Sequence, residues 1–288
     1  MNDPETQDVA SALRAGGALL GDGGRFEAEL LLGAVLGLDR AGLVRERDRR
    51  LSPAETDRYA TLVAARRTGR PIAHLLGRRE FRSLDFLVDE RVLVPRPETE
   101  LLVELALELL PDSPPGPIVD LGTGSGAVAV ALALECPGRA VFAVDLSAGA
   151  LAVARRNVAR LAPDRVSLVR ADWLNAFADD CAALVVSNPP YVEDDYPDLA
   201  TAALGHEPRG ALAAGPEGMD ALRTLVPAAR RCLCSGGWLA VEHGAGQGPA
   251  VRALLAAAGF EAVTTRVDLA GLERTSAGRK PHRVGIAP

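Results

Sequence analysis

The chain has 288 residues, 48% of them hydrophobic and 24% charged, which is typical of a globular protein with one large domain or a small domain joined to a medium one. Its net charge of −6 disfavours a protein whose work depends on neutralising many phosphates, so we expect no direct binding to nucleic acid. Apolar runs stay short of the roughly 20 residues that a membrane span requires, and the acidic start at residues 1–5 lacks the basic and apolar regions of a signal peptide. We therefore expect a soluble, cytoplasmic protein without a membrane anchor.

Four cysteines in a chain of this length do not indicate a disulfide framework, which agrees with a reducing compartment. Cys232 and Cys234 form the one close pair in the sequence, and no second cysteine pair at zinc spacing accompanies them. We expect these thiols to be buried or partly buried, and we expect no metal.

Residues 1–77 are predicted to form a small helical domain. Phe26, Leu30, Leu31 and Ala34 recur at three- and four-residue steps, as on one face of a helix. The segment Ser52-Pro53-Ala54-Glu55 combines a capping box with proline at the first helical position, which predicts a helix start. Residues 78–95 carry short apolar runs broken at Asp89-Glu90 and are predicted to form a β-hairpin linker.

Residues 96–288 alternate between helical and strand patterns. A helix is predicted to begin at Pro97, and apolar strands are predicted at about 117–121, 140–144, 166–170, 183–187 and 238–242. This alternation is typical of an α/β fold with a parallel, doubly wound sheet. Right-handed crossovers bring the carboxyl ends of such strands to one edge, where ligands bind.

A glycine-rich loop follows the first of these strands. The residues Gly122-Thr123-Gly124-Ser125-Gly126 run from Ile118-Val119-Asp120-Leu121 into a helical stretch. Glycines let the backbone turn sharply and approach a ligand, and the amino end of the helix presents unpaired N–H groups. The loop is predicted to bind a nucleotide-like cofactor, and NAD and S-adenosylmethionine both remain possible at this point.

Two further acids follow the next strands of this domain. Asp145 lies at the end of the second strand, where its carboxylate is predicted to accept both hydroxyl protons of a ribose, although a helix cap is the alternative. Asp172-Trp173 follows the third strand. The acid and its backbone are predicted to read an adenine edge, and the indole to cover the ring.

The fourth strand ends in Asn188-Pro189-Pro190-Tyr191, which is the predicted reaction site. Consecutive prolines fix the backbone and remove two donors, so the turn supplies acceptors without competing N–H groups. The Asn188 side-chain oxygen and the Pro189 carbonyl are predicted to accept the two hydrogens of a planar NH2 group.

Such a nitrogen has a delocalised lone pair and is a poor nucleophile. Holding both of its N–H bonds directs it at a methyl donor and stabilises the charge that develops on it. Pro190 would stiffen the turn, and the Tyr191 ring would keep the substrate group in plane. Asn188 is also expected to touch the cofactor. This chemistry favours methyl transfer over hydride transfer.

At this point the sequence resembles the protein-(glutamine-N5) methyltransferases that act on peptide chain release factors. Besides the glycine loop and the reaction site, the resemblance rests on residues 70–77, on Pro95-Arg96-Pro97-Glu98-Thr99-Glu100, on Glu242-His243-Gly244 and on Gly278-Arg279. The segment from Pro95 to Glu100 discriminates best.

The resemblance implies a class I S-adenosylmethionine-dependent methyltransferase, seven-stranded and Rossmann-like, with an N-terminal helical domain that helps to grip the substrate. The implied substrate is the glutamine of the Gly-Gly-Gln loop in class I release factors, and the enzyme is expected to be a monomer. Residues 122–126, Asp145 and Trp173 are implied as cofactor contacts, and His74, His243 and Arg96 as supporting positions. Leu272 stands where relatives often have a polar residue, so the packing of the last hairpin is left open.

Three alternatives to this substrate assignment remain open. A glutamine methyltransferase that acts on a ribosomal protein differs mainly in the segment from Pro95 to Glu100. An N6-adenine methyltransferase uses the same tetrapeptide, but it must extract a base and usually has a basic recognition region, which the acidic charge balance disfavours. A binding module without activity would not need an intact glycine loop, Asp145 and Asn188 together.

Overall fold

The computed structural model describes residues 7–200 and 204–282. The acidic start at residues 1–5 and the outer ends of the predicted domains 1–77 and 96–288 lie outside these residues. The chain divides into two compact units, one made of residues 1–77 and 200–206 and the other of residues 78–199 and 207–288. In the described ranges, no helix has both the length and the apolar character that crossing a membrane requires.

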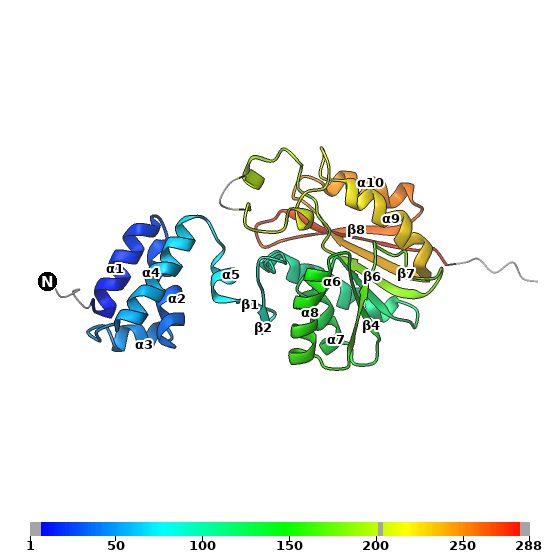
Figure 1. The fold of residues 1–288 in the computed structure, drawn as a ribbon. Coiled ribbons are helices and arrows are strands. Elements are labelled where there is room, and N and C mark those ends of the chain that lie inside the picture. Colours follow the sequence, from blue (N-terminus) through cyan, green and yellow to red (C-terminus); the bar gives the residue numbers. More distant parts are fainter. Residues whose placement is uncertain (1–6, 201–203, 283–288) are drawn as a thin grey trace, which may run out of the picture. The chain divides into compact units, whose positions relative to one another are not determined.

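The first unit is helical, as the sequence predicted. Its helices are α1 (Val9–Leu20), α2 (Gly24–Leu36), α3 (Arg40–Arg45), α4 (Pro53–Arg67) and α5 (Ile72–Leu76) (Figure 1). The capping box at the start of α4 is present, with Ser52 and Glu55 each bonded to the other's backbone N–H. The core of the unit includes Ala28, Leu31 and Leu32 of α2.

Two of the apolar residues that predicted α2 are not in this core. Phe26 is 57% exposed and Leu30 is 37% exposed, whereas Leu31 is fully buried. The spacing therefore predicted the helix correctly, but it did not show which of these residues are buried. The reason is that α2 is apolar on more than one side, so the spacing alone does not say which side packs inward.

The second unit begins with a hairpin of β1 (Arg78–Phe81) and β2 (Leu84–Leu87), which pair antiparallel. Arg82 and Ser83 form the two-residue turn with positive φ at both positions, which matches the right-handed twist of a hairpin. Buried side chains of the hairpin, Phe81 and Phe86, join the core of this unit. The hairpin is therefore packed as part of the second unit. Its turn lies at Arg82 and Ser83, and the predicted break at Asp89-Glu90 comes after the end of β2.

A seven-stranded sheet with the order β5-β4-β3-β6-β7-β9-β8 forms the centre of the second unit. The strands are β3 (Ile118–Leu121), β4 (Val141–Asp145), β5 (Val166–Arg170), β6 (Ala182–Ser187), β7 (Leu233–Glu242), β8 (Glu261–Val267) and β9 (Glu273–Arg279). This confirms the predicted doubly wound α/β fold. The sheet is mixed, because β9 runs antiparallel to both of its neighbours, β7 and β8. A short turn joins β8 to β9, and such a connection permits only antiparallel pairing.

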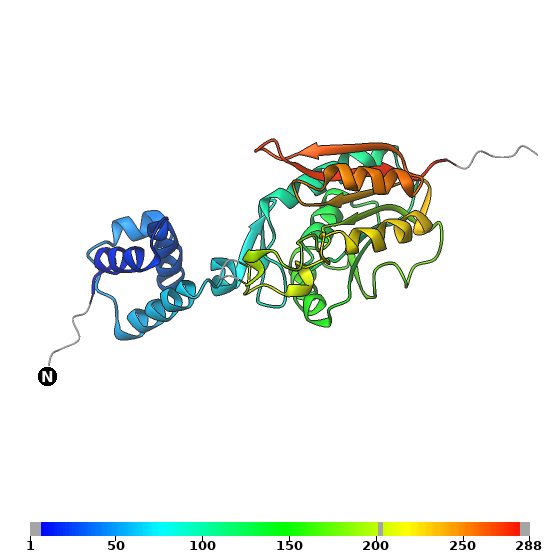
Figure 2. The same ribbon diagram turned by 90° about the horizontal axis from the view of Figure 1, so that it is seen from above.

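Helices cover both faces of this sheet (Figure 1). One face packs on α6 (Glu100–Leu109), α7 (Ala127–Glu135) and α8 (Ala148–Leu161), and the other packs on α9 (Asp220–Cys232) and α10 (Gly248–Ala257). Figure 2 shows α9 and α10 side by side along their face. Short 3-10 turns lie at Pro97–Thr99, Leu110–Asp112, Pro197–Ala200 and Arg209–Ala211.

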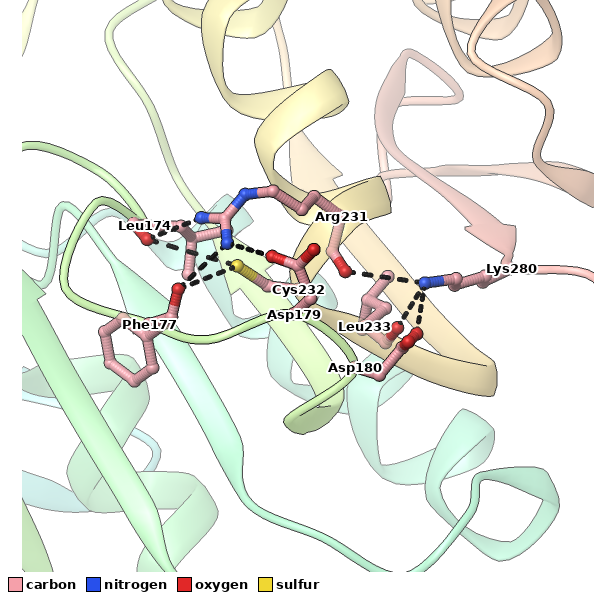
Figure 3. A network of polar contacts seen from close by, with 8 residues as sticks. All are labelled: Leu174, Phe177, Asp179, Asp180, Arg231, Cys232, Leu233 and Lys280. Carbon is pink, nitrogen blue, oxygen red and sulfur yellow. Dashed lines mark hydrogen bonds and ion pairs between the residues drawn. The ribbon is translucent and has the colours of Figure 1, made fainter.

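A polar network near the start of β7 ties the loop after β5 to the rest of the unit (Figure 3). Arg231 donates to the carbonyls of Leu174 and Phe177 at 3.0 Å each and pairs with Asp179 at 2.6 Å. The nearly buried Lys280 ammonium donates at 2.7 Å both to Asp180 Oδ1 and to the Leu233 carbonyl. The network therefore fixes both ends of the segment between Leu174 and Asp180.

Candidate active site

The candidate site lies where the strand order of the sheet reverses. From β3 the chain moves outward to β4 and β5, and it then returns to place β6 on the other side of β3. Leu121 and Ser187 pair at the carboxyl ends of β3 and β6, and the Ser187 hydroxyl donates to the Leu121 carbonyl at 2.8 Å. The residues that follow, Gly122 and Asn188, are therefore neighbours. In open α/β sheets this reversal is the place where ligands bind.

The glycine loop divides into residues that face a cleft and residues that shape the loop. Gly122 and Gly124 line the cleft. They have φ values of +69° and +55°, which side chains rarely adopt. Thr123 and Ser125 are buried, and Gly126 caps α7. A Cβ atom at Gly126 would lie 3.3 Å from Ala154 Cβ, so this glycine allows close packing of α7 against α8.

Asp120 stabilises the glycine loop through its hydrogen bonds, a role that sequence reasoning did not assign. Its Oδ2 accepts from the Thr123 hydroxyl at 2.6 Å and from the Ala129 N–H at 3.2 Å. Burial raises the Asp120 pKa to about 7, while these two hydrogen bonds lower it and the charge of Asp145 raises it further. The sequence did contain a sign of this role, because Asp120 lies inside the otherwise apolar strand β3 and a buried acid requires hydrogen-bond partners.

Asp145, the last residue of β4, connects the glycine loop to the next helix. Its Oδ2 accepts from the Gly124 N–H at 2.9 Å and its Oδ1 from the Ser147 N–H at 2.8 Å. Burial raises the Asp145 pKa, and these backbone hydrogen bonds partly offset that effect. Ser147 is the N-cap of α8, so the cap that was the alternative role for Asp145 is supplied by another residue. Each carboxylate oxygen keeps a second lone pair for a ligand.

The cleft has a volume of about 440 Å³ and brings most of the predicted site residues together. Asp172 and Trp173 lie in its lining, and Trp173 has a φ of +46°, an uncommon conformation that clusters at functional sites. Sequence reasoning did not predict the other residues that line the cleft, among them the exposed Leu146. The lining consists of Arg91, Val92, Leu93, Gly122, Gly124, Val144, Asp145, Leu146, Ser147, Ala150, Ala171, Asp172, Trp173, Asn188, Pro190, Pro208, Gly210 and Ala211.

Asn188 is the predicted reaction-site residue that the structure places most clearly. Its Nδ2 donates to the Thr99 hydroxyl oxygen at 3.0 Å, and the residue lines the cleft. This bond uses the nitrogen end of the amide, so Oδ1 is the end left to accept from a ligand. Pro190 also lines the cleft, whereas Pro189 is buried.

Tyr191 is half-buried, and both its side-chain hydroxyl and its backbone carbonyl form hydrogen bonds. Its hydroxyl donates to Glu242 Oε1 at 3.2 Å, and its carbonyl accepts from Gln247 Nε2 at 3.0 Å. Gly218 has a φ of +65°, and a Cβ atom there would lie 2.2 Å from the Tyr191 carbonyl oxygen. Burial raises the pKa of the Tyr191 phenol, as does the nearby Glu242 carboxylate. The tyrosine is therefore neutral and acts as a donor.

The three supporting residues implied by the resemblance are placed as follows. Arg96 forms an ion pair with the buried Glu207, whose other oxygen accepts from the Val94 N–H at 2.9 Å. His243 is buried and its Nε2 lies 2.9 Å from the Ser276 hydroxyl, while desolvation lowers its pKa. His74 is buried in α5. In the described ranges, no cluster of three or more His, Cys, Asp or Glu residues is arranged to hold a metal ion.

Comparison with known proteins identifies relatives along nearly the whole chain. The PrmC N-terminal domain matches residues 7–77, and the Methyltransferase small domain matches residues 99–217. The release factor glutamine methyltransferase of Burkholderia pseudomallei is 45% identical and covers 89% of this chain and 92% of the relative. The protein of the same name in Bordetella pertussis is 46% identical, with coverage of 90% and 97%.

A solved structure supports the same fold at lower sequence similarity. A methyltransferase from Pyrococcus furiosus has a TM-score of 0.51 and 17% identity, and covers 70% of this chain and 91% of that one. The release factor glutamine methyltransferase of Escherichia coli is 41% identical over 88% of this chain and 92% of the relative. On the strength of these relatives, which span both units, the chain belongs to the family of release factor glutamine methyltransferases.

Proposed function

We propose that this chain transfers a methyl group from S-adenosylmethionine to the side-chain amide nitrogen N5 of the glutamine in the Gly-Gly-Gln loop of class I peptide chain release factors. The observation that carries the proposal is the meeting of Gly122, Gly124, Asp145 and Asn188 around one cleft at the reversal of the strand order. A cofactor loop and an amide acceptor thereby face the same space. The names of the relatives supply the class of substrate.

The cofactor side of the cleft fits S-adenosylmethionine, which when bound supplies an electrophilic methyl group on a sulfonium. Gly122 and Gly124 leave room for the ligand next to the backbone. Asp145 keeps lone pairs for the two ribose hydroxyls while it holds the Gly124 and Ser147 N–H groups. Asp172 would read the adenine edge and Trp173 would cover the ring. The buried Thr123, Ser125 and Gly126 would shape the loop.

The substrate side is assigned to Asn188, Pro189, Pro190 and Tyr191. Asn188 Oδ1 and the Pro189 carbonyl would each accept one hydrogen of the glutamine NH2, so that its nitrogen points at the methyl group. The same acceptors stabilise the positive charge that develops on nitrogen during the transfer. Pro190 restricts the turn, and Tyr191 would hold the amide plane from a position anchored on Glu242.

A contact in the structure bears on the choice of substrate. Thr99 belongs to the segment that distinguishes this family, and its hydroxyl binds the Asn188 amide directly. The discriminating segment thus reaches the Asn188 side chain itself, which favours the release-factor assignment over a ribosomal-protein or adenine target. We further propose that the enzyme is a monomer that works in the cytoplasm without binding nucleic acid directly.

The proposed organisation of the chain keeps three parts, residues 1–77, 78–95 and 96–288. The boundary between the two compact units after Gly77 supports the first division. Residues 1–77 would help to grip the release factor, as the family resemblance implies. Residues 96–288 would carry the methyl transfer.

A methyl-transfer assay tests the proposal directly. Labelled S-adenosylmethionine and a purified class I release factor should give one labelled peptide, the one that contains the Gly-Gly-Gln loop, as identified by mass spectrometry. A release factor with alanine in place of that glutamine should stay unlabelled. Asn188→Ala should lose most of the turnover while cofactor affinity stays within about tenfold. Labelling of DNA with no labelling of the release factor would refute the assignment.

A further inference from the structure

Glu242, the last residue of β7, is a buried carboxylate that the proposed reaction has not used. Its side chain is almost completely inaccessible, and its Oε1 accepts from the Tyr191 hydroxyl at 3.2 Å. Within residues 7–200 and 204–282, its Oε2 is buried and has no hydrogen-bond partner. A buried carboxylate with an unused oxygen is unfavourable, and so its presence calls for an explanation.

Thr99 lies between this carboxylate and the reaction site. Its buried hydroxyl oxygen accepts from Asn188 Nδ2 at 3.0 Å, which occupies the oxygen as an acceptor. The hydroxyl still has one proton to donate. Thr99 is a neighbour of Glu242 and interacts with its carboxylate. The Thr99 proton can therefore turn towards Glu242 Oε2, which is unpaired among the described residues, and the polar contacts would then run in one direction, from Asn188 to Thr99 to Glu242.

Resting on the proposed function, we infer that Glu242 is a positioning residue that fixes which way round the Asn188 amide faces. A carboxylate only accepts hydrogen bonds, so it draws the Thr99 proton towards itself and leaves Thr99 able only to accept from Asn188. The Asn188 nitrogen must then face Thr99, and its oxygen must face the glutamine NH2. The Tyr191 hydroxyl donates to the same carboxylate. Glu242 would therefore hold both side chains that are proposed to contact the substrate amide, Tyr191 directly and Asn188 through Thr99.

The protonation state of Glu242 decides whether this arrangement holds. Burial raises the Glu242 pKa to about 7; Thr99, Tyr191 and the charge of Arg274 lower it, and the charge of Glu98 raises it. A protonated Glu242 can donate to Thr99, whose own proton is then available to Asn188. The Asn188 side-chain amide can then flip and present its NH2 group to the cleft. Two NH2 groups that face each other cannot form a hydrogen bond, so this state does not hold the substrate.

Kinetics of Glu242→Gln and Thr99→Val with a release factor test the inference. Both should lower kcat by at least roughly tenfold, since each loosens an acceptor aimed at developing charge. The cofactor KM should stay near the wild-type value. Thr99→Ser keeps the hydroxyl and should restore most of the activity. Thr275→Val on the neighbouring strand β9 removes a buried hydroxyl that has no hydrogen-bond partner among the described residues, and it controls for general loosening of the sheet edge; it should keep wild-type kcat.

The pH profile separates positioning from a merely structural role. Wild-type kcat should fall as the pH drops through about 7, because Glu242 takes up a proton there. The Glu242→Gln profile should lack this limb. Wild-type kcat in both Glu242→Gln and Thr99→Val, or an acid limb that persists in Glu242→Gln, would overturn the inference.

A second measurement does not depend on the substrate. Hydrogen exchange of the Asn188 side-chain NH2, followed by NMR and assigned by its loss in Asn188→Ala, should be slow in the wild type. Exchange should become faster in Glu242→Gln and Thr99→Val, because the NH2 then spends time facing the cleft. Equal exchange in all three proteins contradicts the inference. If the release factor is not methylated although exchange behaves as expected, the proposed function fails and the orientation of Asn188 stands.

Discussion

Replacing Asp145 with asparagine should weaken cofactor binding strongly while leaving the fold in place. The carboxylate accepts two backbone N–H groups, from Gly124 and Ser147, and is proposed to accept two ribose hydroxyls as well. Asparagine keeps the shape of the side chain but has one acceptor oxygen in place of two. A hydrogen bond to a charged group is worth about 1.5–3 kcal/mol, and about 1.4 kcal/mol corresponds to a factor of ten in Kd, so losing one such bond should raise the cofactor Kd roughly ten- to hundredfold.

Isothermal titration calorimetry with S-adenosylmethionine measures this effect, and thermal unfolding checks the fold. Asp268→Asn is a matched control, because Asp268 also accepts two backbone N–H groups, those of Ala270 and Leu272, but lies outside the cleft lining. The Asp268→Asn protein should be less stable than the wild type but should bind the cofactor with an unchanged Kd. Burial raises the Asp145 pKa, so wild-type affinity should also fall as the pH drops through that raised value, and Asp145→Asn should not show this. A Kd for Asp145→Asn close to that of the wild type would refute the ribose assignment.

Three further changes test the packing around the site. The Lys280 side chain is 9% exposed and that of its partner Asp180 is 34% exposed. Asp180→Asn leaves a buried ammonium without its partner and should lower the free energy of unfolding by about 3 kcal/mol, whereas Lys280→Met leaves the more exposed carboxylate and should lower it clearly less. Equal losses in urea titrations would contradict this. Gly218→Ala should lower both Tm and turnover, because its Cβ would lie 2.2 Å from the Tyr191 carbonyl oxygen at a φ of +65°; an unchanged Tm would contradict it. The Asp120 pKa is about 7 in the folded protein and 3.8 ordinarily, so the folded state favours the protonated acid. This contribution to stability is complete below about pH 4 and is lost as the pH rises to 7 and above. The fall in the free energy of unfolding between pH 4 and 7 should therefore be shallower in Asp120→Asn than in the wild type.

Much of the site was predictable because its residues directly follow strands. Gly122, Asp145, Asp172 and Asn188 come at or just after the ends of β3, β4, β5 and β6. Parallel strands with right-handed crossovers bring these ends to one edge, whatever lies between them in the chain. The motif order alone therefore indicated a shared cleft. In the same way the capping box of Ser52 and Glu55 is a local arrangement, and it formed as predicted.

Other features depend on contacts between residues far apart in the chain. Thr99 and Asn188 are separated by 89 positions, and Tyr191 and Glu242 by 51, so no local pattern pairs them. The exposed side of α2 was likewise not readable from its spacing, because Phe26 and Leu31 both fit an apolar stripe.

What the sequence by itself determined was the fold class, the order of strands and helices, and the chemistry available at the strand ends, because backbone propensity, capping and glycine or proline geometry act within a few residues. The tertiary structure alone decided which loop residues face the cleft, which face of α2 is exposed, and which way round the Asn188 amide is held. Those outcomes depend on close packing of side chains from separate strands and helices, and that packing exists only once the sheet has assembled.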